Sequence, residues 1–260
     1  MRHPDQPESR RVTQPSVPSL AAGLAALTAA AALALAGVAP AAAASRSRSP
    51  SRLLAQVDKA VQKAGSMTFS DRSTSGKVVE TYSGAASGSA AAESLTSTGA
   101  APLQVVLSGG TIYLRSGSTV LESALGLSAT AATAEAGKWI ALQTGDAPYE
   151  SLAGQLTVAS ELNAYIPASH LRIGKVVTVA KQRVIPVYGY PSASAANGAT
   201  AGSAALFLST KSPYLPVAGS LVLAKAGADE RKEVAVFTHW GKPFTVTVPT
   251  GAVPYASLAG

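Results

Sequence analysis

Residues 233–240 read Glu-Val-Ala-Val-Phe-Thr-His-Trp, and this stretch decides the class of fold. Successive side chains of an extended strand point to opposite faces of its sheet. One face here carries Val234 and Val236, and the other carries Ala235 and Phe237. A strand with one face in water would alternate apolar and polar residues, so we expect both faces of this strand to be covered.

The same two-sided apolar pattern recurs in residues 206–208, Leu-Phe-Leu, and in residues 221–223, Leu-Val-Leu. Only a few modest helical segments accompany these strands, and they can cover one face of a sheet but not both. The other face is therefore expected to meet a second sheet, a partner protein or an apolar ligand. An ordinary two-layer core that binds nothing accounts for the same pattern.

Short strand-like runs separated by Gly- and Pro-containing turns fill most of the chain. Tight turns join antiparallel strands, because a parallel crossover needs a dozen or more residues. Helical periodicity predicts an amphipathic helix over 53–65 and further helical segments over 120–136 and 149–162. The sequence thus predicts an α+β fold with an antiparallel sheet, and a loop over 191–202. Strands are expected over 67–73, 77–83, 103–107, 111–115, 138–142, 175–180, 183–188, 204–209, 220–224, 233–240 and 244–248.

Residues 1–44 have the pattern of an export signal. Arginines at positions 2, 10 and 11 precede an apolar stretch over 20–38, and residues 40–44 read Pro-Ala-Ala-Ala-Ala, which offers A-x-A cleavage sites. We expect export followed by cleavage, so that the protein acts outside the cell or at the cell envelope. An uncleaved anchor over 20–38 is the alternative, and both the general and the twin-arginine export routes stay open.

The composition of residues 45–260 limits how this part of the chain can be organised and what it can bind. Residues 45–52 are rich in Ser, Arg and Pro and predict a disordered lead, and residues 53–260 are expected to form a single domain. The chain has no cysteine, which excludes disulfides and a lipid anchor on cysteine. Its formal net charge of +7 is mild, and the scattered basic residues do not form a nucleic-acid footprint. They favour only a loose attraction to an anionic envelope surface.

The chain shows no recognisable catalytic or metal-binding motif. His170 and His239 are the histidines beyond the export segment, and neither stands in a metal-ligand spacing. We expect His239 to be a hydrogen-bonded structural residue and His170 to lie in a surface loop. The G-x-S-x-G and S-x-x-K patterns are absent, so we expect no enzyme activity, no cofactor and no metal ion. A hydrolase with catalytic residues scattered along the sequence stays open as a third alternative.

Two short motifs carry a resemblance to a known family. Residues 105–115 read Val-Val-Leu-Ser-Gly-Gly-Thr-Ile-Tyr-Leu-Arg, and residues 137–140, which follow a predicted helical segment, read Gly-Lys-Trp-Ile. Together with the order of the predicted elements, they resemble the LolA-like lipoprotein-carrier fold, and most of all the actinobacterial LppX/LprG lipoprotein family. The first motif is similar to a hairpin with an apolar-tyrosine strand, and the second to the Lys-Trp strand of that family. The resemblance covers residues 53–248.

The resemblance implies a curved antiparallel sheet, wrapped as a half-barrel, with a few helices packed on its concave face. In that family an apolar cavity between sheet and helices takes the acyl chains of lipids. This family is usually tethered through a lipidated cysteine, which this chain lacks. A soluble carrier, or a paralogue that no longer carries lipid, is therefore expected. The segment 243–258 has no counterpart in the resemblance.

The leading interpretation is an exported, non-enzymatic binding protein that holds a lipid or other apolar ligand between a half-barrel sheet and its helices. Burial of acyl chains alone would supply affinity, at roughly 0.8 kcal/mol for each CH₂ group. The alternative is an envelope protein-interaction or sensory module that docks a partner on the same apolar face. Only one face of each strand can line a cavity. The candidate ligand-binding residues are Leu107, Ile112, Leu114, Leu125, Trp139, Leu206, Phe207, Leu208, Phe237 and Trp240.

Overall fold

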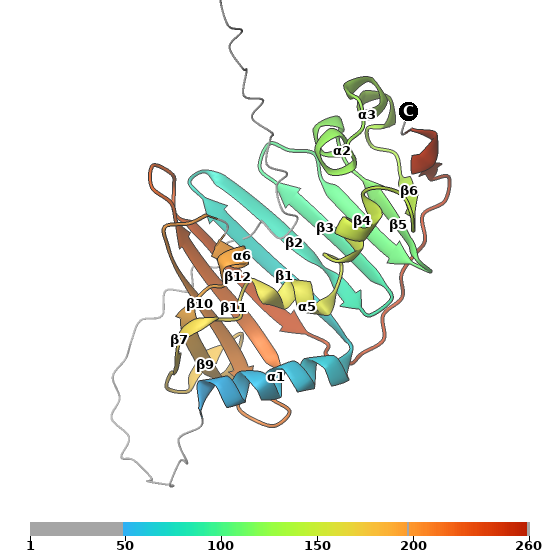
Figure 1. Ribbon diagram of the computed structural model, residues 1–260. Helices are drawn as coiled ribbons and strands as arrows, with labels where there is room; N and C mark the ends of the chain where they lie inside the picture. Colours follow the sequence, from blue (N-terminus) through green and yellow to red (C-terminus); the bar gives the residue numbers. More distant parts are fainter. Residues whose placement is uncertain (1–48, 197, 259–260) are drawn as a thin grey trace, which may run out of the picture.

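The computed structural model describes residues 49–196 and 198–258, so the predicted export signal lies outside the described residues. Within them the chain forms one large open sheet with helices against one of its faces (Figure 1). The strands are β1 (Ser66–Ser75), β2 (Val78–Ser87), β3 (Ala91–Ser97), β4 (Leu103–Ser108), β5 (Thr111–Arg115), β6 (Ile140–Gln143), β7 (Ser169–Ile173), β8 (Val177–Val179), β9 (Gln182–Tyr190), β10 (Ala201–Ser209), β11 (Pro216–Ala224), β12 (Arg231–Thr238) and β13 (Val253–Pro254).

The strand order is β13-β6-β5-β4-β3-β2-β1-β12-β11-β10-β9-β7, and β8 pairs with β9. All neighbouring strands of the described chain run antiparallel except β13 and β6, which run parallel. The sheet stays open, with different strands at its two ends, as in a half-barrel. This confirms the predicted α+β class and the curved sheet with helices on one face.

The helices are α1 (Pro50–Ala64), α2 (Ser118–Leu125), α3 (Ala129–Glu135), α4 (Tyr149–Ala153), α5 (Val158–Asn163) and α6 (Ala193–Ala196), followed by the 3₁₀ turn η1 (Tyr255–Ser257). In Figure 1, α5 and α6 lie in front of the sheet and α1 crosses its lower end. No helix in the described part of the chain is long and apolar enough to span a membrane.

Helix α1 follows the amphipathic pattern of its sequence. Pro50, the first residue of the helix, has no backbone N–H that would need a hydrogen-bond acceptor. Gly65 ends the helix in the left-handed conformation, with a φ of 68°. Its apolar side chains, including Leu53 and Val57, are buried against the sheet. The helix begins earlier than position 53, so residues 50–52 are helical rather than part of the predicted lead.

The predicted hairpin between β4 and β5 is confirmed. Ser108 pairs with Thr111, and the two residues between them, Gly109 and Gly110, have φ angles of 58° and 77°. A two-residue hairpin turn of this kind needs a positive φ at both positions, which glycine adopts without strain. The turn sets the register in which Leu107 lies opposite Ile112.

The register gives the sheet one largely buried face, which we call the inner face. Directly opposed residues of neighbouring strands point to the same side. Val105, Leu114 and Ile140 lie in one such row, and Leu107, Ile112 and Leu142 lie in the next. All six are buried, and α2 to α5 pack on this side. On the outer face Val234 and Val236 are only half-buried, so the expectation that both faces would be fully covered is wrong for this strand.

The predicted helical segments over 120–136 and 149–162 each divide into two short helices. Gly126 adopts a φ of 68° and ends α2, and the Ser128 side chain then accepts the Ala131 N–H to start α3. Thr157 and Ser160 form a reciprocal capping box at the start of α5. Helices α4 and α5 are therefore short segments held mainly by packing on the inner face.

Several sequence predictions differ from the structure. Strands β3 and β7 are not among the predicted ones, and His170 lies exposed in β7 rather than in a loop. The predicted strand over 244–248 is wrong, since this stretch pairs with no strand of the described chain. Prolines at positions 243 and 249 bound it, and proline has no N–H for a sheet. The predicted loop over 191–202 contains α6.

The C-terminal segment crosses to the β6 edge of the sheet (Figure 1). Val253 and Pro254 pair with β6, and the buried Tyr255 donates its hydroxyl proton to the Leu125 carbonyl oxygen at 3.1 Å. The segment without a counterpart in the sequence resemblance thus closes one edge of the sheet and ties it to α2.

Candidate functional site

Most of the predicted ligand-binding residues share the inner face, and all of those that do are buried. The strand residues among them point inward because their register places them in the same rows, and Leu125 joins them from α2. The residues that the structure brings together in this way are Leu107, Ile112, Leu114, Leu125, Leu206, Leu208 and Phe237.

Phe207 and Trp139 do not join the inner face, whereas Trp240 is half-buried and packs against the apolar cluster of that face. Phe207 lies between two inward residues of β10, so it points outward, where its ring meets the Tyr188 ring edge-on at 6.4 Å. Trp139 precedes the inward Ile140, and the Arg115 guanidinium lies over its ring at 5.2 Å.

Trp240 lies two residues beyond Thr238, the last residue of β12, and anchors the strand end. Its indole N–H donates to the Pro216 carbonyl oxygen at 2.7 Å, and its ring lies 6.4 Å from that of Phe237. The role of these three aromatic residues in ligand binding stays a prediction.

The inner face contains one cavity that sequence reasoning missed. It has a volume of about 30 Å³ and lies between β2, β3 and β4 on one side and α5 on the other. A volume of this order holds a group the size of water, not an acyl chain. The apolar lining residues are Leu95, Leu103, Val105 and Leu156, and the polar ones are Tyr82, Glu93, Gln155, Ser160 and Glu161.

Glu93 stands in the middle of the apolar inner face. It lies opposite Gly84 on β2 and opposite Val105 on β4. A Cβ atom on Gly84 would come within 2.9 Å of the Glu93 Cγ, so the glycine leaves room for the Glu93 side chain. Only 6% of Glu93 is exposed, and its Oε1 atom has no hydrogen-bond partner among the described residues.

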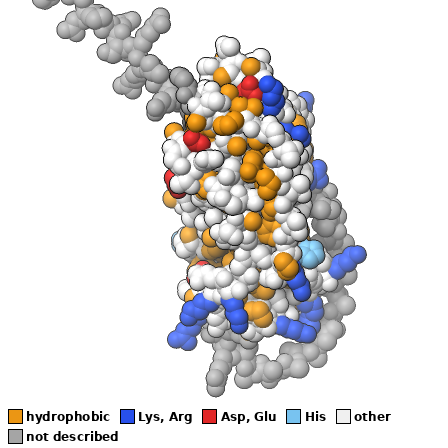
Figure 2. Space-filling model, turned by 90° about the vertical axis from the view of Figure 1, so that its right-hand side faces the viewer, with side chains coloured by type: hydrophobic (Ala, Val, Ile, Leu, Met, Phe, Trp, Pro, Cys, Tyr) orange, Lys and Arg blue, Asp and Glu red, His pale blue; other side chains and the backbone are white. Residues whose placement is uncertain are grey.

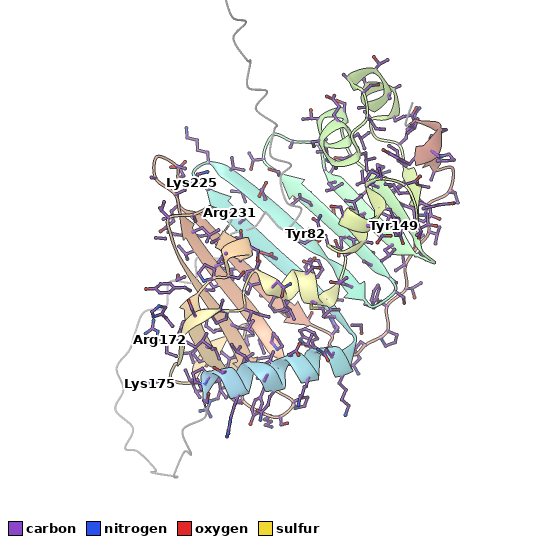
Figure 3. All side chains as sticks on the ribbon, viewed as in Figure 1. Tyr82, Tyr149, Arg172, Lys175, Lys225 and Arg231 are labelled. Atoms are coloured by element: carbon purple, nitrogen blue, oxygen red, sulfur yellow. The ribbon has the colours of Figure 1, made fainter. Side chains whose placement is uncertain are left out.

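One tyrosine hydroxyl serves two buried carboxyl groups. Tyr82 donates to Glu93 Oε2, and the same hydroxyl lies 3.3 Å from Glu161 Oε1 on α5. Because the hydroxyl has a single proton, it can satisfy only one of the two groups as a donor. Burial raises the pKa of Glu93 to about 7, and burial followed by the negative charge of Glu93 raises the pKa of Glu161. In Figure 3, Tyr82 lies in the middle of the sheet close to α5.

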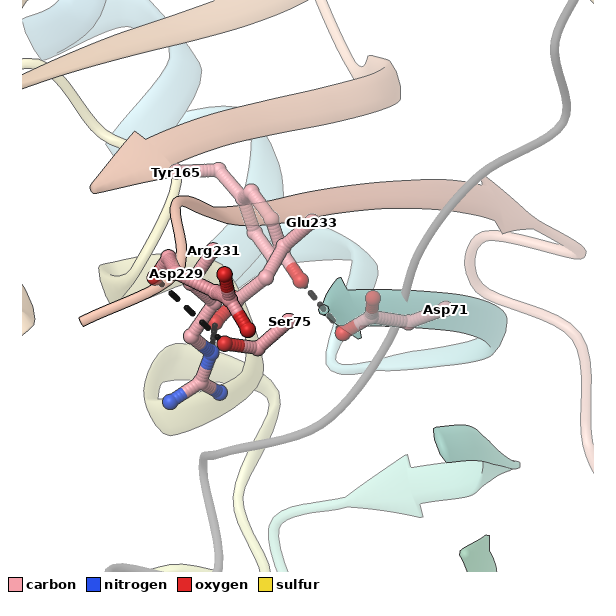
Figure 4. A network of polar contacts seen from close by, with 6 residues as sticks. All are labelled: Asp71, Ser75, Tyr165, Asp229, Arg231 and Glu233. Carbon is pink, nitrogen blue, oxygen red and sulfur yellow. Dashed lines mark hydrogen bonds and ion pairs between the residues drawn. The ribbon is translucent and has the colours of Figure 1, made fainter. Parts of the chain in front are cut away.

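A second polar network adjoins the first toward the end of β1 (Figure 4). Tyr165, which follows α5, donates its hydroxyl proton to Asp71, and its ring lies against Gly219. The Arg231 Nε lies 2.5 Å from Glu233 Oε1. Burial is the main cause that raises the pKa of Asp71, and it raises the pKa of Glu233 to about 7.

The interior side of the sheet thus carries a strong excess of acidic groups. Asp71, Glu80, Glu93, Glu161 and Glu233 influence one another electrostatically, and Arg231 is the cation that acts on three of them. Despite this excess, no three His, Asp or Glu residues within 49–196 and 198–258 lie close enough together to hold a metal ion.

The outer face bears a larger but shallower groove near the β7 edge. Its volume is about 610 Å³, and its lining includes His170, Arg172, Tyr190 and Phe207. The Arg172 guanidinium lies 4.9 Å from the Tyr188 ring. In Figure 3, Arg172 lies at the margin of the sheet, away from Tyr82.

Surface charge is unevenly distributed. On the side of the molecule shown in Figure 2, Lys and Arg side chains gather toward the lower end, where Figure 1 places α1. Helix α1 carries the exposed residues Arg52, Lys59 and Lys63. Hydrophobic side chains are scattered among polar ones over the rest of this side (Figure 2).

Comparison with known proteins identifies the fold. No family model matches the chain, and no curated protein matches it. The crystal structure of the Mycobacterium tuberculosis lipoprotein LppX matches with a TM-score of 0.50 and 13% identity, over 76% of this chain and 98% of that chain. LprF from Mycobacterium bovis matches with a TM-score of 0.43 and 12% identity, over 78% and 97% of the two chains.

The match to LppX shows a common fold at an identity too low to carry function. The order of helices and strands and the open sheet agree with the LolA-like fold of the LppX type that the two sequence motifs implied.

Proposed function

We propose that this domain is an exported, non-enzymatic binding protein that holds a lipid or other apolar ligand between the inner face and its helices. The observation that supports this most is the way the inner face is covered. Its apolar rows, such as that of Val105, Leu114 and Ile140, face the short helices α4 and α5 rather than a second sheet. Segments of this kind are held by side-chain packing rather than by backbone hydrogen bonds, so a ligand that replaces their apolar contacts can displace them.

The described conformation is the closed one, since its cavity of about 30 Å³ cannot hold an acyl chain. Binding requires α4 to move away and α5 to shift, so that the apolar part of the ligand contacts the inner face between them. A chain of 16 carbons would contribute roughly 12 kcal/mol by burial, before the costs of association and ordering. The burial that Leu152, Leu162 and the other inward side chains of α4 and α5 give up is of the same order, at about 1.5–3 kcal/mol for each side chain.

The test is native mass spectrometry of the chain produced with its N-terminal segment and recovered after export, followed by organic extraction. A discrete added mass that matches an extracted lipid supports the proposal. A bare protein mass, together with no uptake of lipid from vesicles, contradicts it. That result would instead favour the envelope interaction module, with partner capture as its own test.

A further inference from the structure

We propose that the apolar ligand carries a protonated amine, which Glu93 and Glu161 bind in the cavity beneath α5. This rests on the proposed function, because it names the class of ligand for the same inner face. It adds that the ligand is a cationic amphiphile rather than a neutral lipid or a fatty acid.

The cavity contains a buried hydrogen-bond acceptor that has no donor within residues 49–196 and 198–258. Glu93 is 6% exposed and lines the cavity, and its Oε1 has no partner among the described residues. Leaving a buried acceptor without a donor costs about 1–3 kcal/mol, more if the group is charged. A donor supplied by a ligand would remove this cost.

In the described part of the chain, Glu93 and Glu161 share a single hydrogen-bond donor, the Tyr82 hydroxyl. Tyr82 offers one proton to Glu93 and Glu161 together, so a second donor is needed whenever both carboxyl groups are ionised. An ammonium group has three donors, whereas an alcohol has one. It can therefore bridge both carboxylates.

The negative charges at and near the cavity favour a cationic ligand. The carboxyl groups that line the cavity are Glu93 from β3 and Glu161 from α5, and Asp71 from β1 acts electrostatically on Glu161. Glu80 from β2 and Glu233 from β12 belong to the adjoining network around Arg231. The titratable tyrosines Tyr82 and Tyr165 face them as well, and Arg231 is the nearby cation. A cationic ligand lowers the electrostatic cost of ionising these groups, and a carboxylate or phosphate raises it.

The size and the lining of the cavity fit an ammonium group with an attached alkyl chain. About 30 Å³ accommodates one ammonium group, and Leu95, Leu103, Val105 and Leu156 surround the carboxyl groups with apolar surface. The first carbons of an attached alkyl chain would contact these leucines and the valine once α5 shifts enough to admit them, with Glu161 still beside Glu93. The cavity therefore joins an acidic end to the apolar rows of β4, β5 and β6.

The test compares three probes of equal chain length, dodecylammonium, 1-dodecanol and laurate, by displacement of the neutral fluorescent probe N-phenyl-1-naphthylamine at pH 7. The full chain is used, and each probe stays below its aggregation concentration. We expect dodecylammonium to bind at least about 10-fold more tightly than 1-dodecanol, and laurate to bind most weakly. Equal binding of the amine and the alcohol, or tightest binding of laurate, overturns the inference and leaves the proposed function standing. If none of the three binds, the proposed function itself fails.

Substitutions test whether Glu93 and Glu161 cause the preference for the amine over the alcohol. Glu93→Gln and Glu161→Gln keep the shape and remove the charge, so we expect each to reduce the preference for the amine to less than about 3-fold while 1-dodecanol binds as before. Glu122→Gln, at an exposed position of α2, is the matched control and should keep the full preference. An unchanged preference in both cavity variants overturns the assignment to Glu93 and Glu161.

A second measurement needs no variant. Pairing with ammonium favours ionised carboxylates, so amine binding at pH 7 should release protons from groups with a pKa of about 7. Calorimetric titration in two buffers of different ionisation enthalpy counts these protons. Release with dodecylammonium and none with 1-dodecanol is expected, and equal proton counts for the two probes contradict the inference.

Discussion

At the scale of single residues, the hydroxyl of Tyr82 holds together groups from three elements. It belongs to β2, it donates to Glu93 on β3, and it lies 3.3 Å from Glu161 on α5. A hydroxyl in this position offsets the desolvation of one carboxyl group at a time, and the Glu93 Oε1 atom has no partner among the described residues. The Tyr82 hydroxyl thus adds a polar contact to the packing of Val158 and Leu162 that attaches α5 to the sheet.

Tyr82→Phe should destabilise the protein by about 1–3 kcal/mol, because it leaves buried acceptors without their donor. The loss should be larger at pH 8 than at pH 5, since a protonated carboxyl group can still donate to its neighbour at pH 5. Chemical denaturation at both pH values measures this. Tyr113→Phe, on the outer side of β5, is the matched control and should change stability by less than about 0.5 kcal/mol. Equal effects of the two substitutions would contradict the role of Tyr82.

Gly219→Ala should destabilise the protein by about 1–3 kcal/mol. A Cβ at this position would lie 2.4 Å from the Tyr165 ring, so the ring, and with it the hydrogen bond to Asp71, must shift. Gly88→Ala is the control, because no atom lies within 4 Å of a Cβ there. Thermal unfolding of both variants checks the prediction. An alanine that is tolerated equally well at both positions would show that the Tyr165 ring moves without cost.

At the scale of elements, alternation explains both what the sequence could predict and what it could not. The hairpin of β4 and β5 follows from its Gly-Gly turn and apolar residues, and α1 follows from helical spacing. Strand β3 reads Ala-Ala-Glu-Ser-Leu-Thr-Ser, and its central inward residue is Glu93, so no apolar alternation marks it as a buried strand. The residues of the acidic cavity were missed for the same reason, and only the pairing with β2 and β4 reveals them.

The short helices α4 and α5 should exchange their backbone amide hydrogens faster than the hairpin of β4 and β5. Helices of this length supply few internal hydrogen bonds, whereas the hairpin lies inside the sheet. Hydrogen exchange followed by mass spectrometry compares both segments in one sample. Equal protection would contradict the opening motion on which the proposed function depends.

At the scale of the whole molecule, the raised pKa values make stability depend on pH. The pKa values of Glu93 and Glu233 rise from an ordinary 4.5 to about 7, mainly because of burial. The unfolded chain releases these protons more easily than the folded one, so the folded state loses relative stability as the pH rises from about 4.5 through 7. The protein should therefore be most stable on the acidic side of neutrality.

We expect the melting temperature to fall by at least about 5 °C between pH 5 and pH 8. Thermal unfolding monitored by circular dichroism in buffers of equal ionic strength measures this. The double variant Glu93→Gln and Glu233→Gln, which cannot ionise at these positions, should show a flatter profile. A melting temperature that rises over the same interval would contradict the assignment.

The pairing of β13 with β6 has a consequence for solubility. An open sheet exposes unpaired N–H and C=O groups along its last strands, and such edges recruit strands of other molecules. At one end Val253 and Pro254 pair with β6, and Pro254 has no backbone N–H that could pair with a strand of another molecule. At the other end the register of β7 shifts between Ser169 and Arg172, which makes that edge irregular. Deletion of residues 251–260 should uncover β6 and produce concentration-dependent oligomers, which light scattering would detect. A truncated chain that stays monomeric would show that the short strand does not guard this edge.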